Sequence, residues 1–197
     1  DEFEQSVTKS INSVILLVIP ISFGAIVLAK PIVKLLFERG VFDNTATNMT
    51  AIALMMYSIG MVAFGLRDIL GKIFYSIQDT KTPMMNGALA MIMNIILNII
   101  LVKYLKLAGL ALATSLSAII CIFLLFRSLK KKIGYFGQDK IINTTIKSIV
   151  ASSLMGLTTH LSYIIIMNLL GNGKIKEVIC LALAILVGIL TYGILII

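Results

Sequence analysis

Two adjacent charged residues, Arg67 and Asp68, lie inside a stretch, residues 50–78, that is long and apolar enough to cross a bilayer. Both lie roughly 16 Å from its C-terminal end at 1.5 Å per residue. That depth is near the middle of a hydrocarbon core about 30 Å thick, where a charge costs at least ~2.5–3.5 kcal/mol. Adjacent helical residues point about 100° apart, so the two side chains do not face each other directly. We therefore predict a polar cavity beside them. The alternative is an Arg–Asp pair that only holds neighbouring helices together.

A second set of polar side chains consists of two amides and two hydroxyls. Asn94 and Asn98 share one face of the third apolar segment. Counting the helical rise from the short link at 105–108 places Asn98 level with Thr114, and Asn94 level with Ser117. These neutral oxygens suit a small hard cation. Because the set contains no carboxylate, hydrogen bonds that only hold two helices together are the favoured interpretation.

No set of residues predicts catalysis. The sequence has no metal-ligand spacing, no nucleophile–base pair and no glycine-rich phosphate loop, so we expect no enzyme. A stripe of small and polar residues in the fifth segment indicates a helix–helix interface. Its members are Ser148, Ser152, Gly156, Thr159 and Tyr163.

The composition is that of a polytopic membrane protein. The chain has 197 residues, of which 59% are hydrophobic and 13% charged, with a mean hydropathy of +1.03. The net charge of +8 comes from basic residues that mostly lie between apolar runs. Positive-inside bias and anionic lipids explain these better than nucleic acid does, so no nucleic-acid partner is expected. Cys121 and Cys180 lie at different depths in apolar segments, which predicts buried free thiols.

Six apolar segments predict an all-α fold of six transmembrane helices, at about 11–29, 50–78, 83–105, 108–129, 143–170 and 177–197. Pro20 lies inside the first segment, where it removes a backbone hydrogen bond. Residues 31–39 predict an interfacial amphipathic helix, and Thr82 a helix N-cap before Pro83. We divide the chain into four helices (1–129), a basic loop (130–142) and two final helices (143–197). The KKK run at 130–132 places that loop, the N-terminus and the 79–82 turn in the cytoplasm. The first residue is not Met, and the chain reads as a piece of a longer protein.

Three blocks resemble the MurJ (MviN) family of lipid II flippases in the MOP transporter superfamily. They are AKPIVKLLFERGVFD at 29–43, AFGLRDILGKIFYSIQDTKTP at 63–83 and LNIILVKYLKLAGLALATSLSA at 97–118. The last two helices match only in hydropathy and placement. The resemblance implies one C-terminal lobe, helices nine to fourteen of fourteen, in the bacterial cytoplasmic membrane. It also implies alternating-access transport of the undecaprenyl-pyrophosphate-linked peptidoglycan precursor, with a missing N-terminal lobe and membrane lipids as further partners.

The resemblance also implies roles for individual residues. Arg67 faces the headgroup cavity, where its planar guanidinium suits pyrophosphate, with Asp68 as its polar partner. Lys72 adds charge nearer the cytoplasmic mouth, although snorkelling to the interface is the stronger interpretation. The final two helices form a groove for the lipid tail. No cofactor is implied beyond a sodium ion, for which the matching positions are Asn94, Asn98, the Leu110 carbonyl and Thr114. Asn98 stands where the family pattern has a carboxylate, which weakens such a site.

Three other functions stay open from the sequence. Two are transporters of the same superfamily, an O-antigen-type lipid-linked oligosaccharide flippase and a drug/cation antiporter. The third is a non-transporting membrane scaffold, in which Arg67 and Asp68 only lock helices together.

Overall fold

The structure is a computed structural model that describes residues 2–171 and 173–196, and within them the chain is all-helical. Six helices are long and apolar enough to cross a membrane, which confirms the predicted all-α membrane fold. The seventh, α2, is the predicted short amphipathic helix. The helices are α1 (Glu2–Val27), α2 (Ala29–Phe37), α3 (Asn44–Ser76), α4 (Lys81–Leu105), α5 (Leu107–Ile133), α6 (Gln138–Leu170) and α7 (Lys174–Ile196).

Several helices extend beyond the apolar runs that predicted them. α5 continues through the lysines at 130–132, and α6 already begins at Gln138, so the basic loop is much shorter than the predicted 130–142. Lysine is a good helix former, and a helix that has left the bilayer needs no apolar residues to continue. The predicted N-cap at Thr82 is wrong. α4 begins at Lys81, and the Asp79 side chain accepts a hydrogen bond from the Thr82 backbone N–H at 3.0 Å.

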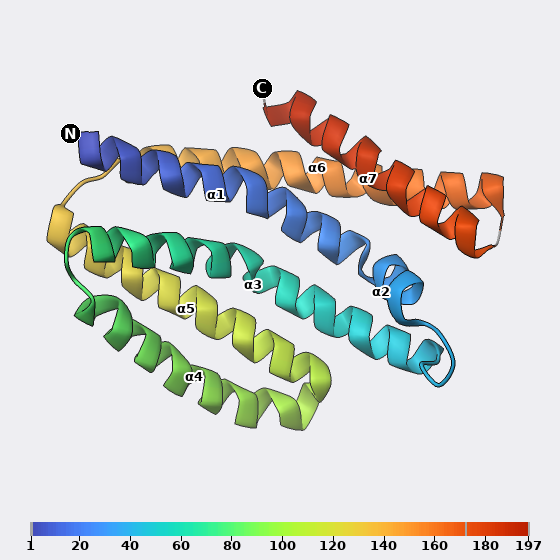
Figure 1. Cartoon of the computed structure of the whole chain (residues 1–197), viewed down its shortest axis with the longest axis horizontal. Helices are drawn as coiled ribbons and strands as arrows, with labels where there is room; N and C mark the ends of the chain where they lie inside the picture. Colours follow the sequence, from blue (N-terminus) through green and yellow to red (C-terminus); the bar gives the residue numbers. More distant parts are fainter. Residues whose placement is uncertain (1, 172, 197) are drawn as a thin grey trace.

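The helices form one bundle in which α1 lies between two groups (Figure 1). On one side α1 packs on α3, which packs on α5, and α5 pairs with α4 in an antiparallel hairpin. On the other side α1 packs on α6, which pairs with α7 in a second hairpin. α4 therefore lies at one edge of the bundle and α7 at the other.

The N-terminus, the α3–α4 turn and the α5–α6 link lie at the same end of the bundle, as the sequence predicts (Figure 1). Thr8 of α1 donates a hydrogen bond to the carbonyl of Phe136, and Lys132 pairs with Asp79. Beneath these contacts α1, α3 and α5 share an apolar core. Its fully buried members include Ile11, Ile15, Leu70, Phe74, Leu125 and Leu129. This core fixes the C-terminal half of α3, where the charged pair lies.

Candidate functional site

Arg67 and Asp68 lie on the side of α3 that is turned away from the apolar core. Leu66 and Leu70 fill that core with exposed fractions of 5% and 0%, whereas the side chains of Arg67 and Asp68 are 53% and 72% exposed. The Nε of Arg67 is 3.9 Å from the Oδ1 of Asp68, at the limit of an ion pair. The guanidinium therefore keeps most of its donors available.

A cavity of about 210 Å³ lies beside Arg67, between α3, α4 and α5. Its wall combines one cation, three neutral polar side chains and a set of small or apolar side chains. A cavity of this composition can orient a ligand through a few polar groups. The lining residues are Phe64, Arg67, Gly87, Ala90, Met91, Asn94, Thr114, Ser117, Ala118 and Cys121.

The polar wall of the cavity is a hydrogen-bonded network between α4 and α5. Asn94 Nδ2 donates to Ser117 Oγ at 3.2 Å and to Thr114 Oγ1 at 3.5 Å. Asn98 Nδ2 donates to Asn94 Oδ1 at 2.9 Å, and Thr114 Oγ1 donates to the Leu110 carbonyl at 3.0 Å. The predicted pairing of Asn94 with Ser117 is confirmed, whereas Asn98 bonds to Asn94 within its own helix.

This network does not fit a sodium ion as it stands. Most of its oxygens already take part in hydrogen bonds within the set, and Asn98 Oδ1 is buried without a partner. Hard cations are held by several oxygen ligands, most strongly by carboxylates, and this set has none. Arg67 also places a positive charge in the wall of the same cavity. Among the described residues no group of three or more His, Cys, Asp or Glu could hold a metal.

The structure brings together only part of the predicted site. Arg67, Asn94 and Thr114 line the cavity, but Lys72, Asp68, Asn98 and Leu110 do not. Lys72 is exposed on α3 beyond the cavity wall. In the sequence, Arg67 and the amide–hydroxyl set are separate features, and the apolar lining of the cavity is not predicted. One available signal was the spacing of Phe64 and Arg67, three apart on one helix face.

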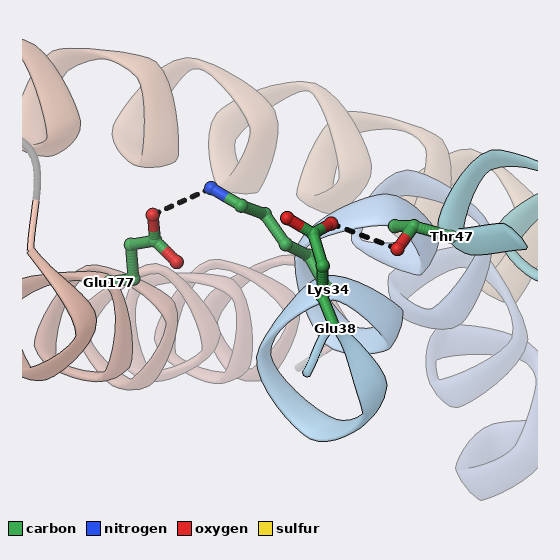
Figure 2. Close-up of polar contacts among 4 residues, drawn as sticks. All are labelled: Lys34, Glu38, Thr47 and Glu177. Atoms are coloured by element: carbon green, nitrogen blue, oxygen red, sulfur yellow. Dashed lines mark hydrogen bonds and ion pairs between the residues drawn. The ribbon is translucent and has the colours of Figure 1, made fainter. Parts of the chain in front are cut away.

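A second cavity, of about 510 Å³, lies at the opposite end of the bundle between α2 and the start of α7. Both Lys34 and Glu177 line it, and Figure 2 shows the Lys34 side chain directed to Glu177, with 2.7 Å between Nζ and Oε1. The neighbouring Glu38 accepts a hydrogen bond from Thr47 Oγ1 at 2.8 Å. The hydrogen bond to Glu177 raises the pKa of Lys34 above its usual value. These contacts fasten α2 to α3 and α7, and no local pattern in the chain predicts them.

Comparison with known proteins connects this arrangement to one family. The family model described as Lipid II flippase MurJ matches residues 1–181. The chain is 37% identical over 155 residues to the probable lipid II flippase MurJ of Vibrio cholerae serotype O1, covering 79% of this chain and 30% of that protein. It is 26% identical over 192 residues to the protein of the same description from Bdellovibrio bacteriovorus, covering 98% of this chain and 36% of that one.

The fold is also similar to a solved structure, described as lipid II flippase MurJ in an inward closed conformation. The TM-score is 0.78 with 27% sequence identity, and the match covers 98% of this chain and 38% of that chain. The chain thus spans about a third of the length of the relatives that it matches. The similarity extends well beyond the three blocks at 29–118 and includes both final helices.

Proposed function

Because this chain belongs to the lipid II flippase MurJ family, we propose that the protein containing it moves lipid II, an undecaprenyl-pyrophosphate-linked peptidoglycan precursor, across the bacterial cytoplasmic membrane. A flippase moves a lipid and leaves its covalent bonds intact, so the chain belongs to a transporter and not to an enzyme. The six membrane-spanning helices form one part of the transport path, and alternating access of this part and the rest of the protein carries the headgroup across.

One observation carries the proposal at the level of this chain. A guanidinium in a membrane-spanning helix lines a cavity instead of a dry helix interface, and its side chain is half exposed. In a buried structural ion pair, the carboxylate would neutralise the guanidinium and occupy its donors. Asp68 does not do this, because its Oδ1 is 3.9 Å from the Nε of Arg67. An arginine donates in a planar fork and stays charged in a partly dry site, which suits a pyrophosphate. The scaffold alternative requires Arg67 to be used within the bundle, so it is disfavoured.

The other walls of the cavity suit the uncharged part of the headgroup. Asn94, Thr114 and Ser117 offer amide and hydroxyl groups that can exchange their mutual hydrogen bonds for bonds to a sugar or peptide. In this proposal Lys72 supplies a second positive charge further along α3, outside the cavity wall. α6 and α7 present apolar side chains that suit the lipid tail, among them Leu161, Ile165, Leu186, Ile189 and Leu190.

The test compares Arg67→Ala and Arg67→Lys in the natural full-length protein. Flipping of a fluorescent lipid-linked precursor is measured in proteoliposomes, beside the amount of folded protein in the membrane. Loss of charge-assisted hydrogen bonds is worth about 1.5–3 kcal/mol, so we expect Arg67→Ala to slow flipping about ten- to hundredfold at unchanged abundance. Arg67→Lys keeps the charge but not the planar pair of donors, so its flipping rate is expected to lie between those of the wild type and Arg67→Ala. Lys72→Ala has a smaller effect.

Arg127→Ala is the matched control, because Arg127 is exposed on α5 and lines neither cavity. It is expected to leave flipping unchanged. If Arg67→Ala lowers folded abundance as much as it lowers flipping, the residue is a structural lock and the scaffold interpretation replaces the proposal.

A further inference from the structure

Pro20 leaves one backbone carbonyl of α1 without its usual partner. In a regular helix the N–H of residue 20 would donate to the carbonyl of Leu16, but proline has no N–H, and α1 continues past it to Val27. In a bilayer core no water replaces that donor, so another protein group must do so. The hydroxyl of Tyr192, on α7, donates to the Leu16 carbonyl at 2.8 Å.

The same hydroxyl also joins α6 to this contact. Ser148 Oγ, on a fully buried residue of α6, lies 2.9 Å from the Tyr192 oxygen. A tyrosine hydroxyl has one hydrogen, and the Leu16 carbonyl takes it, so Ser148 must be the donor in the second bond. A chain of two hydrogen bonds therefore runs from α6 through α7 to α1.

α1 packs on α3 on both sides of Pro20. A Cβ atom placed on Gly65 of α3 would lie 3.0 Å from Val14 Cγ1 and 3.5 Å from Val18 Cγ2, so these two valines rest directly on the helix there. On the other side of the proline, Ser22 donates a hydrogen bond to a backbone carbonyl of α3. Gly65 precedes Arg67 by two residues, so the part of α1 that Tyr192 holds also supports the segment that carries the guanidinium.

We propose that Tyr192 is a positioning residue, which replaces from α7 the hydrogen bond that Pro20 removes from α1 and thereby fixes α1 against the Arg67 segment of α3. The hydrogen bond from Tyr192 to Leu16 does not depend on the proposed function, whereas the role of that bond in positioning Arg67 rests on it. Tyr192 lies beyond residues 1–181, so the family match assigns it no role.

The test is a double-mutant cycle between Tyr192→Phe and Pro20→Ala in the natural full-length protein. Tyr192→Phe removes only the hydroxyl and is expected to lower the thermal unfolding midpoint by about 1–4 °C. Pro20→Ala restores a backbone N–H that can bond to Leu16. In that background Tyr192→Phe is expected to lower the midpoint by less than half as much. Equal shifts in both backgrounds would mean that Tyr192 only packs, and would overturn the proposal.

Two further variants separate this bond from general effects. Tyr57→Phe is the matched control, because the hydroxyl of this exposed tyrosine makes no hydrogen bond within the part of the chain that the structure describes. It is expected to leave the midpoint unchanged. Ser148→Ala removes the bond to the Tyr192 oxygen but leaves the one to Leu16, so its shift is expected to be smaller than that of Tyr192→Phe.

Flipping rates test the link to Arg67. Tyr192→Phe is expected to slow flipping about threefold to tenfold at unchanged abundance, and Pro20→Ala to restore the rate in the double variant. If Tyr192→Phe flips the precursor at the normal rate, although the unfolding midpoints of Tyr192→Phe and Pro20→Ala are coupled, the positioning role is overturned. The proposed function is then left intact. If the Arg67→Ala variant flips the precursor at the normal rate, the proposed function fails. The double-mutant cycle of unfolding midpoints still tests the hydrogen bond from Tyr192 to Leu16.

Discussion

Gly60 of α3 and Ser115 of α5 lie in direct contact where the two helices cross. A Cβ atom on Gly60 would fall 2.6 Å from Ser115 Oγ and 2.7 Å from Ser115 Cα, so the site admits only glycine. Ser115 Oγ in turn donates to the carbonyl of Met56 at 2.6 Å. Small residues allow such close approach in membrane proteins, where packing and hydrogen bonds hold helices together without a hydrophobic driving force. This crossing fixes the two helices whose neighbouring turns line the Arg67 cavity.

The first prediction concerns that crossing. Gly60→Ala is expected to destabilise the protein by about 1–3 kcal/mol, because the new methyl group forces α3 and α5 apart. Gly71→Ala, on the same helix, is the control, since a Cβ there meets nothing within 4 Å. It is expected to be neutral or to stabilise by about 0.5–1 kcal/mol, as alanine favours a helix over glycine. The measurement that tests this is the thermal unfolding midpoint of both variants in detergent. Similar shifts for the two would show that the crossing is looser than described.

The second prediction concerns sodium. The wild-type protein is expected to unfold at the same temperature in sodium and in potassium, because Asn98 supplies no negative charge to the set. Asn98→Asp adds a carboxylate where an oxygen already lacks a partner, and is expected to make the midpoint rise with sodium concentration. Asn86→Asp is the control. Asn86 lies on the same helix, bonds to Ser128 and does not line the cavity, so that variant should not respond to sodium. A sodium-dependent midpoint in the wild type would contradict the prediction.

The third prediction concerns acid. The hydrogen bond to Lys132, followed by the bonds to Thr82, holds the pKa of Asp79 well below its usual value of 3.8. A carboxyl with a lowered pKa stabilises the fold above its ordinary value and loses that contribution as pH falls below it. The difference in unfolding midpoint between wild type and Asp79→Asn is therefore expected to be constant from about pH 8 to 5 and to shrink below about pH 4.

Lys132→Met gives a second measurement of the same contact. Without the ammonium, the pKa of Asp79 moves back towards its usual value, so the loss of stability below about pH 4 should be smaller than in the wild type. A midpoint difference that stays constant to the lowest pH would show that Asp79 makes no such contribution.

The fourth prediction concerns the contact between α2 and α7. Lys34 Nζ lies 2.7 Å from Glu177 Oε1, so Lys34→Glu or Glu177→Lys alone sets like charges against each other at this contact, whereas the double exchange restores an opposite pair. We expect a coupling of about 0.5–1 kcal/mol in a double-mutant cycle, since Lys34 is partly exposed. Because the pKa of Lys34 is raised, its contribution is present below the usual value of 10.5 and lost as pH rises above it. Additive single effects would show that the pair does not hold α2 to α7.

Much of the fold follows from the sequence because apolar runs of sufficient length have few alternatives in a membrane. The six spans, the amphipathic helix and the common end of three connections all appear in the structure. The pairing of Asn94 with Ser117 was also predictable, since a short link fixes the register of an antiparallel hairpin and helical rise does the rest. Hydrophobic run length and helical rise are therefore enough to predict both the membrane spans and the pairing of Asn94 with Ser117.

The rest of the site depends on how non-neighbouring helices pack. Arg67 joins the amide–hydroxyl set only because α3 packs on α5, and no local pattern in α3 specifies that choice. The same holds for Lys34 with Glu177, which are 143 residues apart, and for Tyr192 with Leu16, which are 176 apart. Pro20 showed in advance that a carbonyl needs a donor. It did not show which helix supplies one.

The hydrogen-bonded network of amides and hydroxyls between α4 and α5, here called the seam, affects how these helices respond to a membrane potential. A unit charge carried through a membrane potential gains or loses about 2.3 kcal/mol per 100 mV. The amides and hydroxyls of the seam carry no charge, and Arg67 and Asp68 carry opposite charges on adjacent residues of one helix. When these helices shift together, their central segments do almost no net work against the voltage. The voltage sensitivity of such a shift must then come from charges outside these central segments.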